Sequence, residues 1–226
     1  MKRIYRVMGF LVLIVVACAE ATAQQESYLS WTAARAVDVG KSMRRQVRAG
    51  SSLGFRGLHT ERAISYKLRA TWLTPEVIRA TARHLQLRMR LSNEQTMALV
   101  SEAEAAAQTV MMVEIDPQEG SGVIPLDWLA FLQPKSLKGG SLQGMKGTTN
   151  PSFKNLKALA GVRQRDYSYD VFWVAFPLVD DKGVPVFSDS MREAELVVRI
   201  YNKHGTVSWP IPDSIRQRAR ALSQQE

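Results

Sequence analysis

The segment from Glu193 to Pro210 constrains the fold of this chain most, because its pattern is that of a β-hairpin. Leu196, Val198 and Ile200 alternate with residues of mixed polarity, which is typical of a strand buried on one face. The sequence Asn202-Lys203-His204-Gly205 then favours a type I turn closed by a left-handed glycine. The residues after this turn continue the alternation, so we expect an antiparallel pair of strands here.

Two helix-start signals predict a helical hairpin over residues 75–108. Thr74 can cap a helix that has proline at its first position, and Ser92 with Gln95 has the spacing of a capping box for a second helix. The apolar face expected of the first helix comprises Ile78, Ala82, Leu85 and Met89. The hairpin should therefore pack against the strands that precede and follow it.

The order of the elements predicts the fold class. Strands are expected at residues 63–72, 109–115 and 167–179. The sequence Asp180 to Gly183 repeats the turn chemistry of the first hairpin, so a second hairpin is expected there. Strands joined by tight turns, without a β-α-β rhythm, argue against a doubly wound sheet. We expect one α+β domain over residues 60–212, in which an antiparallel, sandwich-like β-sheet carries the helical hairpin as an insertion.

The middle and the end of the chain give weaker signals. Residues 123–132 are apolar but contain Pro125, which argues against a central strand, so we expect an edge strand or a docked loop. Residues 134–151 are rich in glycine, serine and lysine and are expected to form a mobile surface loop. Residues 213–226 are expected to be a C-terminal tail with helical character.

Residues 1–23 have the three parts of a secretory signal peptide. Basic residues precede a short apolar run, and small residues permit cleavage after Ala23. The sequence Val15-Val16-Ala17-Cys18 also resembles a bacterial lipobox, in which Cys18 would be lipidated, and the sequence leaves both routes open. Either route predicts an exported protein that is periplasmic, secreted or lipid-anchored to the envelope. Because no cysteine follows Cys18, internal disulfides and cysteine nucleophiles are excluded.

Residues 24–59 are expected to hold an N-terminal helix and a linker. Apolar residues from Tyr28 to Val47 have loosely helical spacing, and basic residues gather toward the end of this stretch, where they would suit the carboxyl end of a helix. Residues 49–57 are rich in glycine and serine, which is typical of a linker. We therefore place the boundary of the main domain near Thr60.

The chain stays basic after removal of residues 1–23, which takes away three basic residues and Glu20 and leaves a net charge of +7. Exported proteins do not ordinarily meet nucleic acid, so anionic lipids or acidic glycans are the expected counterparts, unless the charge only confers solubility. The basic residues that could form such a surface lie on the first helix of the hairpin, at Arg79, Arg83, Arg88 and Arg90.

Catalytic signals are weak. The best group of carboxylates comprises Glu114, Asp116, Glu119 and Asp127, of which Glu114, Asp116 and Asp127 are the candidate catalytic residues. Two of them could act as acid and base if the fold brought them together. The three histidines lack ligand spacing, and we expect neither a metal nor another cofactor.

Three functions are consistent with these patterns. The leading hypothesis is an exported, non-catalytic binding or accessory module that meets an unknown envelope protein or an anionic surface, with no nucleic-acid partner. The second is a hydrolase that uses the carboxylates near Asp116 and Asp127. The third is a peripheral binder of anionic lipid or glycan, which would use the arginine-rich face of the first hairpin helix, with membrane contact through that face or through a lipid anchor.

Overall fold

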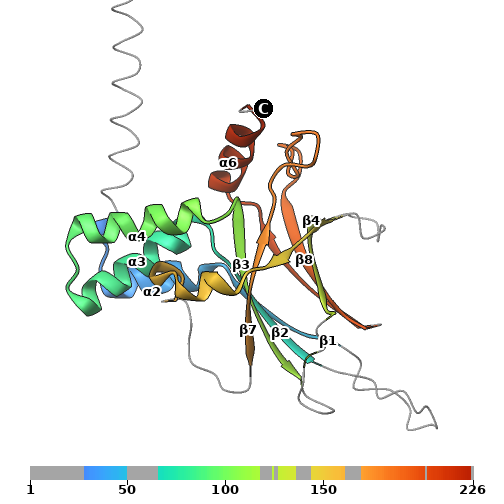
Figure 1. The fold of residues 1–226 in the computed structure, drawn as a ribbon, viewed down its shortest axis with the longest axis horizontal. Helices are drawn as coiled ribbons and strands as arrows, with labels where there is room; N and C mark the ends of the chain where they lie inside the picture. Colours follow the sequence, from blue (N-terminus) through green and yellow to red (C-terminus); the bar gives the residue numbers. More distant parts are fainter. Residues whose placement is uncertain are drawn as a thin grey trace, which may run out of the picture.

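The computed structural model describes residues 28–49, 66–117, 124, 127–135, 144–160, 169–201 and 203–224. Over these residues the chain is an α+β protein with two antiparallel sheets and several helices (Figure 1). This agrees with the α+β class that the sequence predicts. The expected signal segment, residues 1–23, and Cys18 within it lie outside the described residues.

The larger sheet has five strands in the order β1-β2-β3-β7-β6. Their bounds are Arg44–Ala49 for β1, Tyr66–Trp72 for β2, Thr109–Pro117 for β3, Asp170–Phe176 for β7 and Thr148–Thr149 for β6. The first seven residues of β3 are buried, and β3 lies at the centre of the sheet. The continuous apolar run predicts a central strand, and β3 contributes residues of one face to one hydrophobic core and residues of the other face to a second core.

The smaller sheet has four strands in the order β5-β4-β8-β9. Their bounds are Met145–Lys146 for β5, Leu129–Pro134 for β4, Glu193–Ile200 for β8 and Lys203–Pro210 for β9. Strands β8 and β9 form the predicted hairpin. Leu196, Val198 and Ile200 all lie in the core, which confirms the buried face expected for this hairpin.

The connection of this hairpin differs from the predicted one. Ile200 pairs with Lys203, so Tyr201, which has a φ of 51°, and the residue after it join the strands. Gly205 instead lies within β9. A Cβ on Gly205 would be 3.1 Å from Ala49 Cβ, which belongs to the other sheet. The physical reason for a glycine here is therefore the close approach of the two sheets, and not the turn.

The two sheets share the larger hydrophobic core. Strand β2 contributes alternate residues to it, namely Tyr66, Leu68, Ala70 and Trp72. The hydroxyl of Tyr66 donates a 2.7 Å hydrogen bond to the carbonyl of Val198, and the rings of Trp72 and Trp209 meet edge to face at 5.9 Å. The chain passes from β5 in one sheet to β6 in the other at Gly147. Both contacts and this crossing join the sheets into one body.

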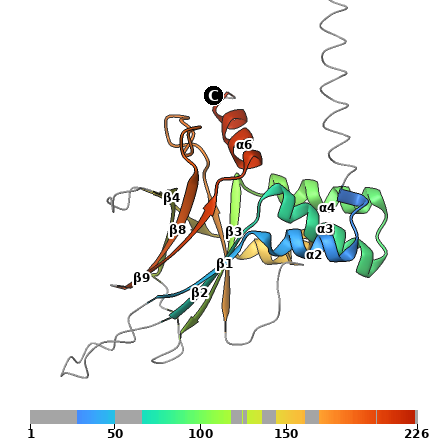
Figure 2. The ribbon, with the colours of Figure 1, turned by 180° about the vertical axis from the view of Figure 1, so that it is seen from behind.

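Helices cover part of the second face of the larger sheet (Figures 1 and 2). They are α2 Ala33–Ser42, α3 Pro75–Met89, α4 Asn93–Ala105, α5 Lys157–Ala160 and the 3-10 helix η1 Pro151–Asn155. Helices α3 and α4 are the predicted hairpin. Thr74 caps α3, and Ser92 and Gln95 form the predicted capping box of α4. A second core lies between this helical layer and the sheet, with Val77, Val100 and Met112 among its members.

The tail folds as helix α6, Asp213–Ser223, which confirms its expected helical character. Ile215 and Ala219 are buried in the core. The guanidinium of Arg218 donates to the carbonyls of Glu104 and Ala107 at the carboxyl end of α4. Burial lowers the pKa of Arg218, while the charge of Glu104 opposes this shift. A cation at this end suits the helix dipole of α4.

The segment before residue 60 departs from the sequence-based expectation. Helix α2 ends at Ser42, and Arg44–Ala49 form strand β1 instead of the end of a helix. The pairing runs from Arg44 opposite Thr71 to Ala49 opposite Tyr66, so backbone hydrogen bonds to β2 override a loosely helical pattern. Because β1 and β2 are neighbours in one sheet, the sheet extends across the expected domain boundary near Thr60.

The structure also differs from the sequence-based expectations for the middle of the chain. Strand β4 begins after Pro125, which lies outside the described residues, and it lies between β5 and β8 instead of at an edge. The expected loop at residues 134–151 contains strands β5 and β6. Two-residue strands are too short to produce a periodic signal in a sequence, which explains why a loop was expected. Residues 136–143 of that loop lie outside the described residues.

Candidate functional site

Glu114 is the most buried of the candidate catalytic residues. It lies on β3 opposite Arg69, on the face turned away from the shared core, and its side chain is 1% exposed. Its carboxylate accepts from Arg44 Nη2 at 3.1 Å and from Arg69 Nη1 at 3.4 Å. The Arg69 guanidinium also stacks 4.1 Å from the centre of the Tyr169 ring. A buried carboxylate between two guanidinium groups is typical of a structural ion pair.

The other carboxylates have different surroundings. Asp116, two residues further along β3, accepts from Lys67 Nζ at 3.3 Å. Asp127 is exposed in the turn before β4, and Glu119 lies outside the described residues. The structure thus brings Glu114 and Asp116 onto one strand but gives each a cationic partner. We find no contact that would pair Asp127 with either of them within the described residues.

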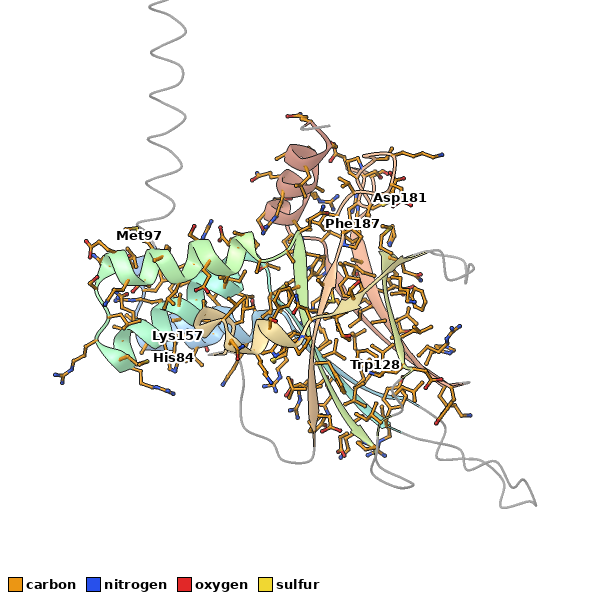
Figure 3. All side chains as sticks on the ribbon, viewed as in Figure 1. His84, Met97, Trp128, Lys157, Asp181 and Phe187 are labelled. Atoms are coloured by element: carbon orange, nitrogen blue, oxygen red, sulfur yellow. The ribbon has the colours of Figure 1, made fainter. Side chains whose placement is uncertain are left out.

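A cavity of about 270 Å³ opens between the two sheets, beside β4, β6 and β7. Its lining includes Trp128, Lys146, Thr148, Thr149 and Val174. The ring of Trp128 lies 4.8 Å from that of Phe172, within the sheet half of the molecule (Figure 3). None of the residues that line this cavity is a carboxylate or a histidine. The carboxylates of the hydrolase hypothesis that the structure describes, Glu114, Asp116 and Asp127, therefore do not line this cavity.

The four arginines of the hairpin fall into two groups. Arg79 Nε lies 3.3 Å from Glu104 Oε1, and Arg83 Nε donates to the carbonyl of Trp31 at 2.9 Å. Arg88 follows Arg79 by about two and a half helical turns, so it points to the opposite side of α3. Arg88 and Arg90 are both exposed. Two of the arginines thus stabilise the helical layer, and the other two face solvent.

Beside the exposed arginines lies an apolar surface that sequence reasoning missed. We define the hairpin tip as Leu87–Arg90, where α3 ends before α4. Leu87 is 41% exposed and Met89 is 54% exposed. The prediction that Met89 lies on the buried face is therefore wrong. Helical periodicity shows which residues share a face, but burial also needs a neighbouring surface, and periodicity does not show where that surface ends.

Three further observations concern metal sites, membrane-spanning helices and similarity to other proteins. Among the described residues, no group of three or more His, Cys, Asp and Glu side chains could hold a metal ion. No helix in the described part of the chain is long and apolar enough to cross a membrane. Comparison of the chain with models of protein families, with curated proteins and with solved structures finds no match in any of the three.

Proposed function

We propose that this chain is a non-catalytic binding or accessory module with a sandwich-like β body, and that it acts after export. The ion pairing of Glu114 supports the first part of this proposal most strongly. A general acid or base must be able to exchange a proton with a substrate. The carboxylate of Glu114 is 1% exposed and is held between Arg44 and Arg69 instead of facing the cavity beside β4.

The N-terminal sequence supports the second part. A basic start, an apolar centre and small residues before position 24 follow each other in the order of an export signal. Cys18 offers lipid attachment as the alternative to cleavage after Ala23. In either case the mature domain reaches an oxidising compartment without internal disulfides, so its stability comes from the two hydrophobic cores.

The export part is tested by the intact mass of the protein purified from a bacterial cell that produces it. Loss of residues 1–23, or an acylated Cys18 as the first residue, is the expected result. Cys18→Ala should abolish the acylated form and leave the cleaved form unchanged, which distinguishes the two routes. A chain that keeps residues 1–23 and stays in the cytosol would contradict export.

The non-catalytic part is tested with a panel of ester, peptide and glycoside substrates. We expect no saturable turnover from the parent protein or from the variant that combines Asp116→Asn and Asp127→Asn. Asp38→Asn, at an exposed position on α2, is the matched control. Turnover that the parent and the control share, and that the double variant loses while its circular dichroism spectrum is unchanged, would establish the hydrolase instead.

A further inference from the structure

We propose that the hairpin tip, Leu87–Arg90, is a contact site for an anionic phospholipid surface. This inference rests on the proposed export of the chain, because export brings the domain to a membrane face. It names one partner for the module, and it places the contact at one end of the helical layer.

The tip presents apolar side chains on a rigid support. Gln86 is 6% exposed, and its carbonyl accepts from the amides of Arg90 and Leu91. Its side chain accepts from Arg83 at 2.6 Å and donates to Asn93 at 2.9 Å. These bonds fix the end of α3 to the start of α4. Leu87 and Met89 are therefore held outward, so insertion into a bilayer needs little additional ordering of the protein.

The charge of the tip is complementary to an anionic surface. Arg88 and Arg90 are exposed beside the two apolar residues, and Glu94 at the start of α4 offsets part of their charge. Arg90 also has a φ of 55° and a ψ of 42°, a left-handed conformation in which glycine or asparagine is usual at the end of a helix. An arginine is thus present where backbone geometry would favour another residue. Apolar residues with basic neighbours are typical of interfacial membrane contacts.

The start of the described chain places the helical layer close to the proposed anchor. Tyr28 is 1% exposed and packs in the core of this layer, and Trp31 accepts a hydrogen bond from Arg83. Nine residues lie between Cys18 and Tyr28, and the ten Cα-to-Cα steps that join them reach at most about 36 Å. A lipid on Cys18 would therefore hold the helical layer near the bilayer. The first described residues and the α3–α4 end of the molecule lie on the same side, away from the β8–β9 hairpin (Figure 2).

The absence of cysteine after Cys18 permits a direct test. A dye that senses polarity can be attached to Met89→Cys in the exported, processed protein, because Cys18 is either removed or acylated there. Phosphatidylcholine vesicles that contain phosphatidylglycerol should shift the emission of this dye to shorter wavelength. Vesicles without phosphatidylglycerol should shift it less. The same dye at Val184→Cys or Tyr201→Cys, two exposed positions in turns beside the sheets, should not respond.

Charge variants in the Met89→Cys protein test the role of the arginines. Arg90→Gly should weaken vesicle binding about fivefold, since one basic residue is lost, without lowering the melting temperature, because glycine suits the left-handed position. Reversal of both charges by Arg88→Glu and Arg90→Glu should weaken it more than about 25-fold. Arg48→Glu with Arg192→Glu, at exposed positions on β1 and before β8, is the control with the same change in net charge.

Three results would overturn the proposal: no dye response at position 89, equal responses at positions 89 and 184, or equal loss of binding in the tip and control variants. Binding of a soluble acidic glycan that depends on Arg88 and Arg90 but not on Leu87→Ser would also overturn it, in favour of a glycan site. The mass of the mature protein tests export separately. A processed chain whose tip does not respond to vesicles refutes the tip contact and leaves the proposed function standing.

Discussion

Gly183 and Gly205 end two four-residue segments with the same sequence signal, but they have different roles. Gly183 has a φ of 72°, as the turn signal predicts. Gly205 lies inside β9, where a Cβ would be 3.1 Å from Leu68 Cδ2 of the facing sheet. The first glycine is required by its backbone conformation and the second by the distance between sheets. Only the second reason involves residues that are distant in the sequence.

Gly205→Ala should therefore destabilise the protein by about 1–3 kcal/mol, because the added methyl group overpacks the shared core. Ala49→Gly should recover part of this loss, since it removes one of the two methyl groups that lie 3.1 Å from the added Cβ. Gly40→Ala is the matched control. Gly40 lies within α2 and a Cβ there would have no neighbour within 4 Å, so this change should stabilise by up to about 1 kcal/mol. Urea denaturation measures all of these variants. Equal stability of the parent and Gly205→Ala would refute the packing argument.

At the scale of elements, caps and turns follow closely from local sequence. Thr74, Ser92 and Gln95 make the hydrogen bonds that their spacing predicts. The turn at Asp180 is equally local. Asp180 Oδ1 accepts from the amides of Lys182 and Val184, each at 2.9 Å. These bonds lower the pKa of Asp180, with the amide of Val184 as the larger cause.

This shift predicts how the turn responds to pH. A carboxyl group whose pKa is lower in the folded state stabilises the fold at pH values above its pKa in the unfolded chain, which is about 3.8 for an aspartate. This contribution is lost as the pH falls through the lowered pKa. Asp180→Asn should therefore reduce stability at pH 7, and the difference from the parent should shrink in acid. Melting curves at a series of pH values measure it.

Asp181→Asn, in the same turn, is the control, because it removes the same charge and leaves the two amide bonds to Asp180 in place. A difference between Asp180→Asn and the parent that stays constant from neutral to acid pH would contradict this account of the turn.

At the scale of the whole molecule, the strand before residue 60 joins both sheets. Strand β1 pairs with β2, and the indole of Trp209 donates a 2.7 Å hydrogen bond to the carbonyl of Met43. The same carbonyl accepts from the amide of Trp72. Removal of this segment would expose the edge of β2 and leave the buried indole of Trp209 without its acceptor.

A chain that begins at Thr60 should therefore fail to fold cooperatively, whereas the chain that begins at residue 24 should unfold in one transition. Circular dichroism melting and the dispersion of amide proton resonances measure the difference. A cooperative transition and dispersed resonances in the shorter chain would support the domain boundary near Thr60.

The sequence by itself determined the local structure: the helix starts at Thr74 and Ser92, the central position of β3 and the turn at Asp180. Each depends on contacts between residues close in the chain, or on an apolar pattern that one element carries alone. The candidate catalytic residues were visible in the sequence, but their pairing was not. Arg44, Arg69 and Glu114 meet only because β1, β2 and β3 are adjacent in the sheet.

The tertiary structure decided the rest. It made residues 44–49 a strand, because an edge of β2 was available for pairing. It gave Gly205 its role, because two sheets meet there. It left Leu87 and Met89 exposed, because burial depends on which surface lies opposite a residue, and no local pattern contains that information. The same limit explains why the hairpin tip emerged as a candidate site from the structure and not from the sequence.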